Sequence, residues 1–558
     1  MLKKILFVHL FFVTVVGFSQ STFVPTNTWY YNMADRYEII QGEINPYFHT
    51  SFKTYQRKDM VNFIDSFDMQ KTVLSKNDYF NFSYFQSDNP EFTLSNAAKT
   101  DKPLFNTFFS NRNAVYSYRD KDIDVFINPV ININTQKDML SDQTAWQSTR
   151  GIEVRGMIGK RVGFYTYLTD NQIKAPEYVG KMVSKIGNYP GIGLTKGYKN
   201  SPYTYDFFDA RGYITFQAAP FIHMQFGHDK NFIGDGYRSL ILSDYSKEYL
   251  QLKTTVKVWK INYTIINAEL ATYNSSLSGK DLRSKFMAMH YLDMNITKKF
   301  NIGLFENIIF SRGDSATGNG SYDINYLNPI IFYRALEHNA AVSSDNALLG
   351  GTFKWIPVRN LKIYGQFLLD EFHAKEIIKH PESYLNKHGT QLGVKYTNAF
   401  KLKNLDLQAE YNVVRPYTYQ HFRRETNYSN FAYPLAHPLG ANFKELLGIV
   451  NVQLAKKFYV MGKFQYATFG TDSTYKQNYG QDINKLYTSA LNKDNSPIGQ
   501  GIPNKLISIE GSVSYMAYHN VFVDLRATYR GLNANTTDKS MFVMIGLRWN
   551  ASYRNLDF

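Results

Sequence analysis

Short runs in which apolar and polar residues alternate recur in pairs along most of the chain. A clear example is 361–370, where the two alternating sets are Ile363, Gly365, Phe367 and Leu369, and Lys362, Tyr364, Gln366 and Asp370. Successive side chains of an extended strand point to opposite faces, so this pattern predicts a strand with one apolar and one polar face. The run 350–357 and a polar turn at Val358–Asn360 come before it, which predicts an antiparallel hairpin.

About eighteen strands of this kind are predicted from Asp124 onward. Most are near the length that a tilted strand needs to cross a bilayer. They are 124–134, 148–158, 161–170, 211–219, 221–228, 247–258, 261–271, 283–296, 299–310, 350–357, 361–370, 388–397, 404–413, 445–455, 457–467, 505–517, 519–530 and 540–549.

The predicted connections alternate between short and long. Tight turns such as Gly159-Lys160, Ala219-Pro220 and Tyr518-His519 separate the two strands of each hairpin. The longest connections between hairpins are 171–210, 229–246, 311–349, 371–387, 414–444 and 468–504. Transmembrane barrels have this asymmetry, with short periplasmic turns and long outer loops. A soluble β-sandwich has no reason to keep all its long loops at one end.

The polar faces of the predicted strands carry charges. In 404–413, the acidic residues Asp406 and Glu410 alternate with an apolar set, and in 519–530 Asp524 and Arg526 do the same. Charges packed against a second sheet would cost several kcal/mol each unless paired, whereas a hydrated lumen accommodates them. The pattern therefore predicts an all-β fold, a transmembrane antiparallel β-barrel of about 18 strands in the bacterial outer membrane, with a small, partly helical N-terminal region.

The first part of the chain lacks the hairpin pattern. Residues 1–20 are predicted to be a signal peptide, since Lys3 and Lys4 precede an apolar stretch that is short for a membrane span. Residues 21–123 are predicted to form an N-terminal region on the periplasmic side or a plug inside the barrel, with short helices near Met60–Met69 and Leu104–Ser110. The barrel would occupy 124–558.

Composition agrees with a barrel and limits the chemistry. Aromatic residues make up 16% of the 558 residues, with 43 Tyr and 42 Phe, as expected for aromatic girdles and a filled lumen. Composition alone does not exclude a secreted array of β-sandwich domains. The absence of cysteine excludes thiolate zinc sites, iron–sulfur clusters and cysteine nucleophiles.

Charge suggests the kind of partner. Without residues 1–20 the chain has 60 Lys and Arg against 47 Asp and Glu, a net charge of +13. A signal peptide argues against nucleic acid, so the expected partners are outer-membrane lipid and lipopolysaccharide, and an acidic surface polysaccharide.

Candidate ligand-binding residues lie where the topology predicts the extracellular mouth. They are Arg150, Asn171, Gln172, Asp235, Tyr237, Arg238, Asp345, Asn346, Gln366, Asp370 and Glu371. An equally good interpretation is that the charged members form a salt-bridge network that braces inward-folded loops. Loop aromatics such as Tyr203 and Tyr475 could stack on sugar rings or serve only in packing. Gly234 and Gly236 are better explained by turns or close packing than by phosphate binding.

The sequence predicts no catalytic or metal-binding motif and no cofactor. HExxH and GxSxG motifs are missing. Asp370 and Glu371 are adjacent, so in a strand they face opposite sides and do not make a glycosidase pair by themselves.

Several stretches resemble a known family. RGIEVRG (150–156), DNQ with APEY (170–178), GDGYRSLILSD (234–244), DNALLGGTFKW (345–355) and IYGQFLLDEF (363–372) resemble the Wzi-type capsule-assembly outer-membrane barrels. LFNTFFSNRNAVY (104–116) and VFINPVININ (125–134) fit the RemB-like branch of Bacteroidetes gliding-motility proteins. The resemblance implies a barrel of about eighteen strands with a helical N-terminal part. It further implies a lectin that holds capsular polysaccharide, and for the branch a link with surface motility.

Three functions are therefore considered. The first is a non-enzymatic barrel that binds or organises capsular or other surface polysaccharide in gliding motility or surface adhesion, together with gliding or secretion machinery proteins. The second is a porin-like diffusion channel for small solutes, because the predicted lumen carries charges of both signs. The third, an outer-membrane hydrolase such as a phospholipase, requires a Ser/His pair on the lipid-facing wall that the sequence does not place.

Overall fold

A computed structural model describes most of the chain. The described residues are 21–26, 28–67, 74–93, 99, 104, 107–272, 282–313, 320–330, 332–333, 344–370, 379–552, 554 and 556–558. The predicted signal peptide, residues 1–20, and the candidate ligand residue Glu371 lie outside them.

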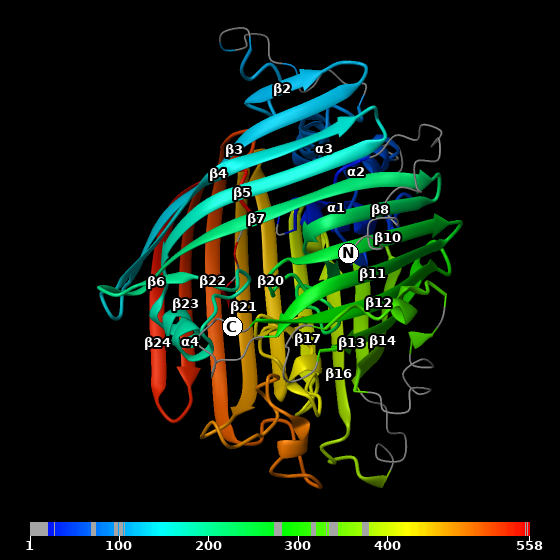
Figure 1. Ribbon diagram of the computed structural model, residues 1–558. Helices are drawn as coiled ribbons and strands as arrows, with labels where there is room; N and C mark the ends of the chain where they lie inside the picture. The colour runs from blue at the N-terminus through cyan, green and yellow to red at the C-terminus, as the bar shows by residue number, and fades with distance from the viewer. Residues whose placement is uncertain are drawn as a thin grey trace, which may run out of the picture.

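Eighteen long antiparallel strands form a closed barrel in the described part of the chain. Each pairs with the next in sequence, and the last strand closes the barrel on the first, with Trp549 opposite Ile131. The strands are β3 (Ile123–Asp138), β4 (Thr144–Ile158), β5 (Val162–Lys174), β7 (Ser201–Ala219), β8 (Ile222–Asp229), β10 (Tyr249–Val258), β11 (Ile261–Thr272), β12 (Arg283–Asn295), β13 (Phe300–Phe310), β14 (Asn346–Val358), β15 (Leu361–Asp370), β16 (Lys387–Tyr396), β17 (Leu405–Val414), β20 (Phe443–Ala455), β21 (Phe458–Thr471), β22 (Ile502–Tyr518), β23 (Val521–Asn533) and β24 (Thr537–Trp549). Figure 1 shows β3–β7 crossing β20–β24 at a steep angle, as the two walls of a tilted barrel do.

The predicted fold class is confirmed, and each predicted strand corresponds to one observed strand. The main differences are at the long-loop end, where several observed strands extend further than the alternating pattern predicted. The largest difference is β7, which begins at Ser201 rather than near 211. Two short strands, β2 (Tyr116–Arg119) and β6 (Lys196–Tyr198), pair with β3 and β7.

The outer and inner faces of the wall differ as the alternation predicted. Outward-facing Leu304, Leu392 and Leu525 expose more than half of their surface, while inward-facing Lys362 and Glu410 are buried. Leucine and other apolar side chains thus cover the outside, which is the surface that hydrocarbon chains contact in an outer-membrane barrel.

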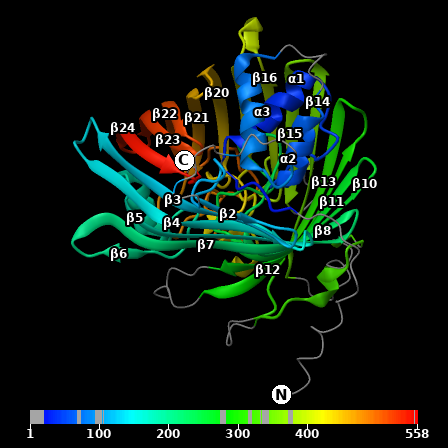
Figure 2. The ribbon, with the colours of Figure 1, turned by 90° about the horizontal axis from the view of Figure 1, so that it is seen from above.

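Three helices of the N-terminal region lie within the ring of strands (Figure 2). They are α1 (Tyr30–Gln41), α2 (Arg57–Asp65) and α3 (Lys76–Asp88). Backbone hydrogen bonds join this region to the short turns: Ile44 N donates to Lys298 O at 2.7 Å, and Asn360 N donates to Ile39 O at 3.0 Å. The helices therefore occupy the short-turn end of the lumen, and we call residues 21–93 of the described chain the plug.

Aromatic packing holds the plug together. Tyr37, Phe63 and Phe85 are almost fully buried in one core with Phe522 of the barrel wall. A capping box starts α3, because Ser75 Oγ accepts from Asp78 N and the Asp78 carboxylate accepts from Ser75 N. The helix predicted near Met60–Met69 corresponds to α2. The helix predicted at Leu104–Ser110 is wrong for the described residues, because Leu104 and Phe108 instead pair across a tight turn.

Long connections at the other end fold back into the lumen. The segment after β8 contains β9 (Phe232–Ile233), which pairs with β1 (Phe52–Lys53) of the plug, and its residues Leu240 and Leu242 are fully buried. Other short elements in the connections are α4 (Glu177–Ile186), β18 (Ser429–Asn430), β19 (Tyr433–Pro434) and the 3-10 turns η1 (Ile324–Leu327), η2 (Ala399–Lys401), η3 (Arg424–Thr426) and η4 (Tyr487–Ser489). The plug and the inward loops therefore meet inside the barrel.

No helix among the described residues is long and apolar enough to cross a membrane.

Candidate functional sites in the lumen and at the rim

The predicted mouth residues do not form a single site. The structure places Asn171, Asp235, Tyr237, Arg238, Gln366 and Asp370 inside the barrel, mostly buried. Arg150 and Gln172 lie on the outer face of the wall, and Asp345 and Asn346 lie at the start of β14. Three groups of side chains must therefore be considered separately.

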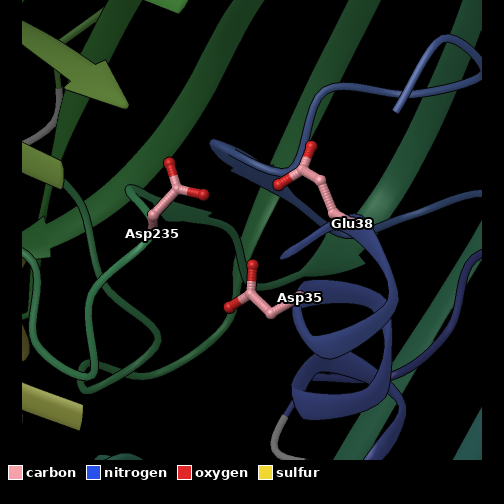
Figure 3. A group of neighbouring side chains, drawn as sticks. All are labelled: Asp35, Glu38 and Asp235. Atoms are coloured by element: carbon pink, nitrogen blue, oxygen red, sulfur yellow. The ribbon is translucent and has the colours of Figure 1, made fainter. Parts of the chain in front are cut away.

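Asp235 belongs to a cluster of carboxylates at the centre of the lumen. Asp35 and Glu38 project from α1 toward Asp235 on the loop after β9, as Figure 3 shows. Lys362 of β15 lies among them, with Nζ 2.6 Å from Asp35, 3.0 Å from Glu38 and 2.9 Å from Asp235. Lys354 adds a second ammonium 3.3 Å from Glu38, and Lys395 a third beside Asp35.

Three carboxylates this close could in principle hold a metal cation. In this structure the ammonium groups of lysines are the cations that balance their charge. The carboxylate oxygens lie within 4.8 Å of one another, but Lys362 Nζ already contacts all three. Burial alone would raise the pKa of Asp35, yet Lys362 and Lys395 outweigh it and hold that pKa below its usual value. The cluster is therefore a charge-balanced ion-pair network that joins the plug, the wall and an inward loop.

Tyr237 and Arg238 belong to a second network with the C-terminal tail. Arg238 Nη1 donates to Asp557 Oδ1 at 3.1 Å, and the Tyr237 hydroxyl donates to Asp557 Oδ2 at 2.6 Å. Lys463 of β21 lies 2.8 Å from the same carboxylate. Burial would raise the pKa of Asp557, but Arg238 and Lys463 lower it below the usual range.

The backbone of the same loop is held by the wall. Glu410 of β17 accepts hydrogen bonds from Tyr237 N at 2.8 Å and Arg238 N at 3.1 Å. A Cβ on Gly236 would lie 2.7 Å from the carbonyl oxygen of Arg238, and Gly234 has a φ of +123°, a backbone conformation that L side chains rarely adopt. Close packing therefore explains Gly236 and the backbone turn explains Gly234, as the sequence suggested.

Gln366 and Asp370 fix further loops to β15. Gln366 Nε2 donates to Ile233 O at 2.8 Å and its Oε1 accepts from Leu240 N at 2.8 Å. Asp370 accepts from Tyr419 N at 2.5 Å and lies 3.3 Å from Lys387 Nζ. These lumen residues thus brace inward-folded loops.

The remaining candidates have local partners. Asn171 accepts from Thr149 Oγ1 at 2.8 Å inside the wall, whereas Arg150 and Asp170 pair at 3.2 Å on its outer face. Asp345 takes two hydrogen bonds from Arg312, and Asn346 Nδ2 donates to Thr426 O at 2.9 Å. Gln172 lies half-buried on the outer face of β5.

A cavity of about 470 Å³ remains between the plug and the inward loops. Among the described residues that line it, twelve Lys and Arg side chains face eight Asp and Glu, a surplus of four positive charges. Lys53 of the plug has no ion-pair partner among those residues, and its ammonium lies 4.2 Å from the centre of the Phe232 ring. Burial lowers the pKa of Lys53 to about 8.

The rim carries an aromatic and basic patch that sequence reasoning missed. We call it the rim patch; its residues come from three separate loops and are Tyr384, Phe422, Arg423, Tyr487 and Lys493. The rings of Tyr384 and Tyr487 are 6.1 Å apart, and Lys493 Nζ lies 5.9 Å from the Tyr384 ring. Tyr487 N donates to His421 O at 3.4 Å, which brings Phe422 and Arg423 beside it. Arg423 and Lys493 are exposed and the three rings are half-buried.

Only the fold brings these five residues together. More than 100 positions separate Tyr384 from Tyr487, and no motif or spacing links the three loops. The one signal in the sequence was the general abundance of Tyr with Lys and Arg in the long connections.

The fold and these sites define the class of protein. It is a bacterial outer-membrane β-barrel whose lumen holds its own N-terminal plug and inward-folded outer loops, braced by buried ion pairs.

Comparison with solved structures gives the same fold. The chain is similar to Wzi of Escherichia coli, an outer-membrane protein involved in group 1 capsule assembly and described as a carbohydrate-binding β-barrel. The match has a TM-score of 0.54 at 13% identity and covers 96% of this chain and all of Wzi. The chain also matches OprD of Pseudomonas aeruginosa, with a TM-score of 0.41 at 10% identity over 76% of this chain and 94% of OprD. No protein-family model and no curated protein sequence matches the chain.

Proposed function

We propose that this protein is a non-enzymatic outer-membrane barrel that binds or organises an acidic surface polysaccharide at its extracellular rim. The observation that carries the proposal is the occupied lumen: the plug enters from one end, loops enter from the other, and buried ion pairs join them to the wall. A barrel whose lumen is filled in this way is suited to binding a ligand at its rim rather than to conducting solutes through its lumen. The similarity to Wzi in fold, over nearly the whole chain, is consistent with this role.

The rim patch is the surface we assign to the glycan. Half-buried rings offer flat apolar faces for sugar rings, and the exposed Arg423 and Lys493 offer charge to carboxylate, sulfate or phosphate substituents. The net charge of +13 that remains without residues 1–20 favours acidic over neutral glycans. A ligand role for the earlier candidates Arg150, Asn171 and Gln172 stays a prediction.

The direct test measures binding of the purified protein in detergent to polygalacturonate and to neutral dextran. We expect binding to polygalacturonate, and a loss on the order of tenfold when Arg423 and Lys493 are both changed to Glu, as a change of about 1.4 kcal/mol gives. Lys298→Glu is the matched control, because this lysine is exposed at the opposite, short-turn end. Equal binding by all three proteins would contradict the assignment of the rim patch.

The finer assignment is to the RemB-like branch of the Wzi-type barrels, with roles in gliding motility or adhesion. A strain lacking the protein should then retain less acidic capsule and spread less on a surface, and the R423E/K493E variant should restore neither. If the deletion strain behaves as the parent in both assays, the proposed function is wrong.

One observation favours a second function, a porin-like channel. The cavity of about 470 Å³ retains charged walls and a positive surplus, as a pathway for anionic solutes would. Single-channel conductance separates the two functions and is argued in the Discussion.

A further inference from the structure

Among the described parts of the long connections, the one between β13 and β14 differs from the rest, because part of it lies against the outside of the barrel. We call the described residues 320–330, Phe332 and Tyr333 the outer-wall flap. Tyr322 donates its hydroxyl to Asn267 Oδ1 at 2.5 Å, and Tyr263 donates its hydroxyl to Pro329 O at 2.7 Å. Both partners belong to β11, and Tyr263 is only its third residue from the short-turn end. The flap therefore reaches from the rim down most of the wall.

The flap covers polar side chains that face outward. On β12, Met289 and Tyr291 pack in the lumen, so His290 between them points to the outside. Its cross-strand partner Glu306 lies on the same outer face, and Tyr333 of the flap covers both. Tyr333 N donates to Glu306 Oε2 at 2.9 Å, and its ring stacks on His290 at 3.9 Å. Bare carboxylate and imidazole groups at this place would be costly against hydrocarbon.

The largest exposed side chains of the flap are apolar, and the polar Ser321, Asn325 and Asn328 are exposed beside them. Ile330 is 90% exposed and Ile324 is 76% exposed, and Leu327 and Phe332 expose about half of their surface. Four large apolar residues on one loop are unusual for a surface in water. They continue the apolar belt of the wall, in which Leu304 of β13 is 59% exposed.

Several backbone groups of the flap have hydrogen-bond partners within the protein. Tyr326 N donates to Asp323 O at 3.1 Å, Asn328 N donates to Asn325 O at 3.4 Å, and Ile330 N donates to Asn328 Oδ1 at 3.1 Å. Pro329 has no N–H, and its carbonyl accepts the Tyr263 hydroxyl. Non-helical backbone at membrane depth is tolerated only where it is buried in protein or lines a water-filled cavity, because unsatisfied polar groups are costly in hydrocarbon. The flap meets this condition where the wall binds its backbone, at Pro329 O and Tyr333 N.

The charged groups in the described part of the connection, Arg312, Asp323 and Asp345, stay together at its rim end. Arg312 pairs with Asp323 at 2.9 Å and with Asp345 at 2.6 Å, and Asp345 also accepts the Tyr326 hydroxyl at 2.7 Å. We propose that the outer-wall flap is embedded in the bilayer, with Ile324, Leu327, Ile330 and Phe332 in contact with lipid acyl chains. One long connection of this protein thus leaves the aqueous rim and binds membrane lipid.

The chain contains no cysteine, so one introduced cysteine carries a single nitroxide label. We would label Ile330→Cys, Leu304→Cys and Tyr475→Cys in the full-length protein, reconstituted in phospholipid vesicles at a low protein-to-lipid ratio. Leu304 is the reference for the lipid-facing wall, and Tyr475, 84% exposed on a rim loop, is the reference for water. Collision of the label with oxygen, which concentrates in lipid, is compared with collision with a water-soluble nickel chelate.

The label at Ile330→Cys is expected to match that at Leu304→Cys, with an oxygen-to-nickel ratio several-fold above that at Tyr475→Cys. A ratio equal to that of Tyr475→Cys would place the flap in water and overturn the proposal. Protection from both reagents would mean that another protein, such as a second copy, covers the flap, and this would also overturn it. Heat-dependent migration on a gel confirms that each variant is folded, and Phe332→Cys repeats the measurement at a second position.

Discussion

At the scale of single residues, Lys362 is the centre of the plug-to-wall contact. It is fully buried and touches Asp35, Glu38 and Asp235 at 3.0 Å or less. Replacing it by Met keeps the length of the side chain and leaves the three carboxylates with two lysines rather than three. Removing one partner of a buried ion pair costs roughly 3–5 kcal/mol, because the remaining charge loses its compensation.

We therefore expect Lys362→Met to lower the free energy of unfolding by roughly 3–5 kcal/mol in urea titrations of the detergent-solubilised protein. The control is Lys298→Met, since Lys298 pairs with Glu43 at 3.4 Å but is 81% exposed. That change should stay within about 1 kcal/mol, as exposed pairs do. Equal losses in the two variants would mean that the central cluster does not stabilise the plug.

The carboxylates of the plug and tail give a pH dependence whose sign follows from their lowered pKa values. Asp35, Asp235 and Asp557 all titrate below their usual pKa because lysine or arginine outweighs burial. A lowered pKa contributes stability that is complete above the unfolded value, about 3.9, and is lost as the pH falls further. In urea titrations the contribution of these carboxylates should be constant from pH 7 to about 5 and be lost below about pH 4, whereas His421, whose pKa burial lowers to about 3, adds a separate loss of stability below about pH 6.5. The difference in stability between the intact protein and Asp557→Asn isolates one carboxylate, and a shrinking of that difference between pH 7 and 5 would contradict this.

At the scale of elements, the C-terminal tail holds the inward loop that carries Arg238 in place. Asp557→Asn keeps the shape of the tail and leaves Arg238 and Lys463 without their shared carboxylate. We expect the loop to loosen while the strand ladder stays intact, so trypsin added to whole cells should cleave after Arg238 many times faster. Asp538→Asn is the control, because Asp538 is 37% exposed and only 3.9 Å from Lys181. Unchanged resistance to trypsin would show that Asp557 is dispensable.

The elements differ in how well the sequence predicted them. The strands were predictable because lipid outside and polar groups inside impose a period of two on every wall strand, as in β15 and β17. The helices α1 and α3 were missed because they are buried on several sides and lack an apolar stripe. Aromatic and polar residues are mixed around both of them, so no helical period stands out.

The contacts inside the lumen could not be predicted from the sequence, for a different reason. Lys362 and Asp35 are 327 positions apart, and Arg238 and Asp557 are 319 apart. Nothing local in the sequence shows which loop folds inward, because the partner of each buried charge lies on another element. Most of the predicted mouth residues face the inside of the barrel rather than a shared opening, and a ligand role for them stays a prediction.

At the scale of the whole molecule, the plug decides between a binding protein and a channel. The plug is joined to the wall by the central ion pairs, by packing of the Trp29 ring against the Tyr459 ring, and by hydrogen bonds to the short turns. The inward loops add a second layer, and β1 pairs directly with β9 between the two. Solutes would need to displace both layers, although the cavity between them is about 470 Å³.

We expect the intact protein to give no steady single-channel steps in planar bilayers at pH 7. Lys362→Met should give intermittent openings, because loss of the central ammonium weakens the contact between plug and wall. Lowering the pH well below about 4, toward the lowered pKa values of Asp35 and Asp235, should do the same to the unmodified protein, since protonation of these carboxylates removes the same attraction. The K298M variant is the control and should stay silent at pH 7. Steady conductance by the intact protein at pH 7 would contradict the occupied lumen as a barrier and favour the porin-like function over polysaccharide binding.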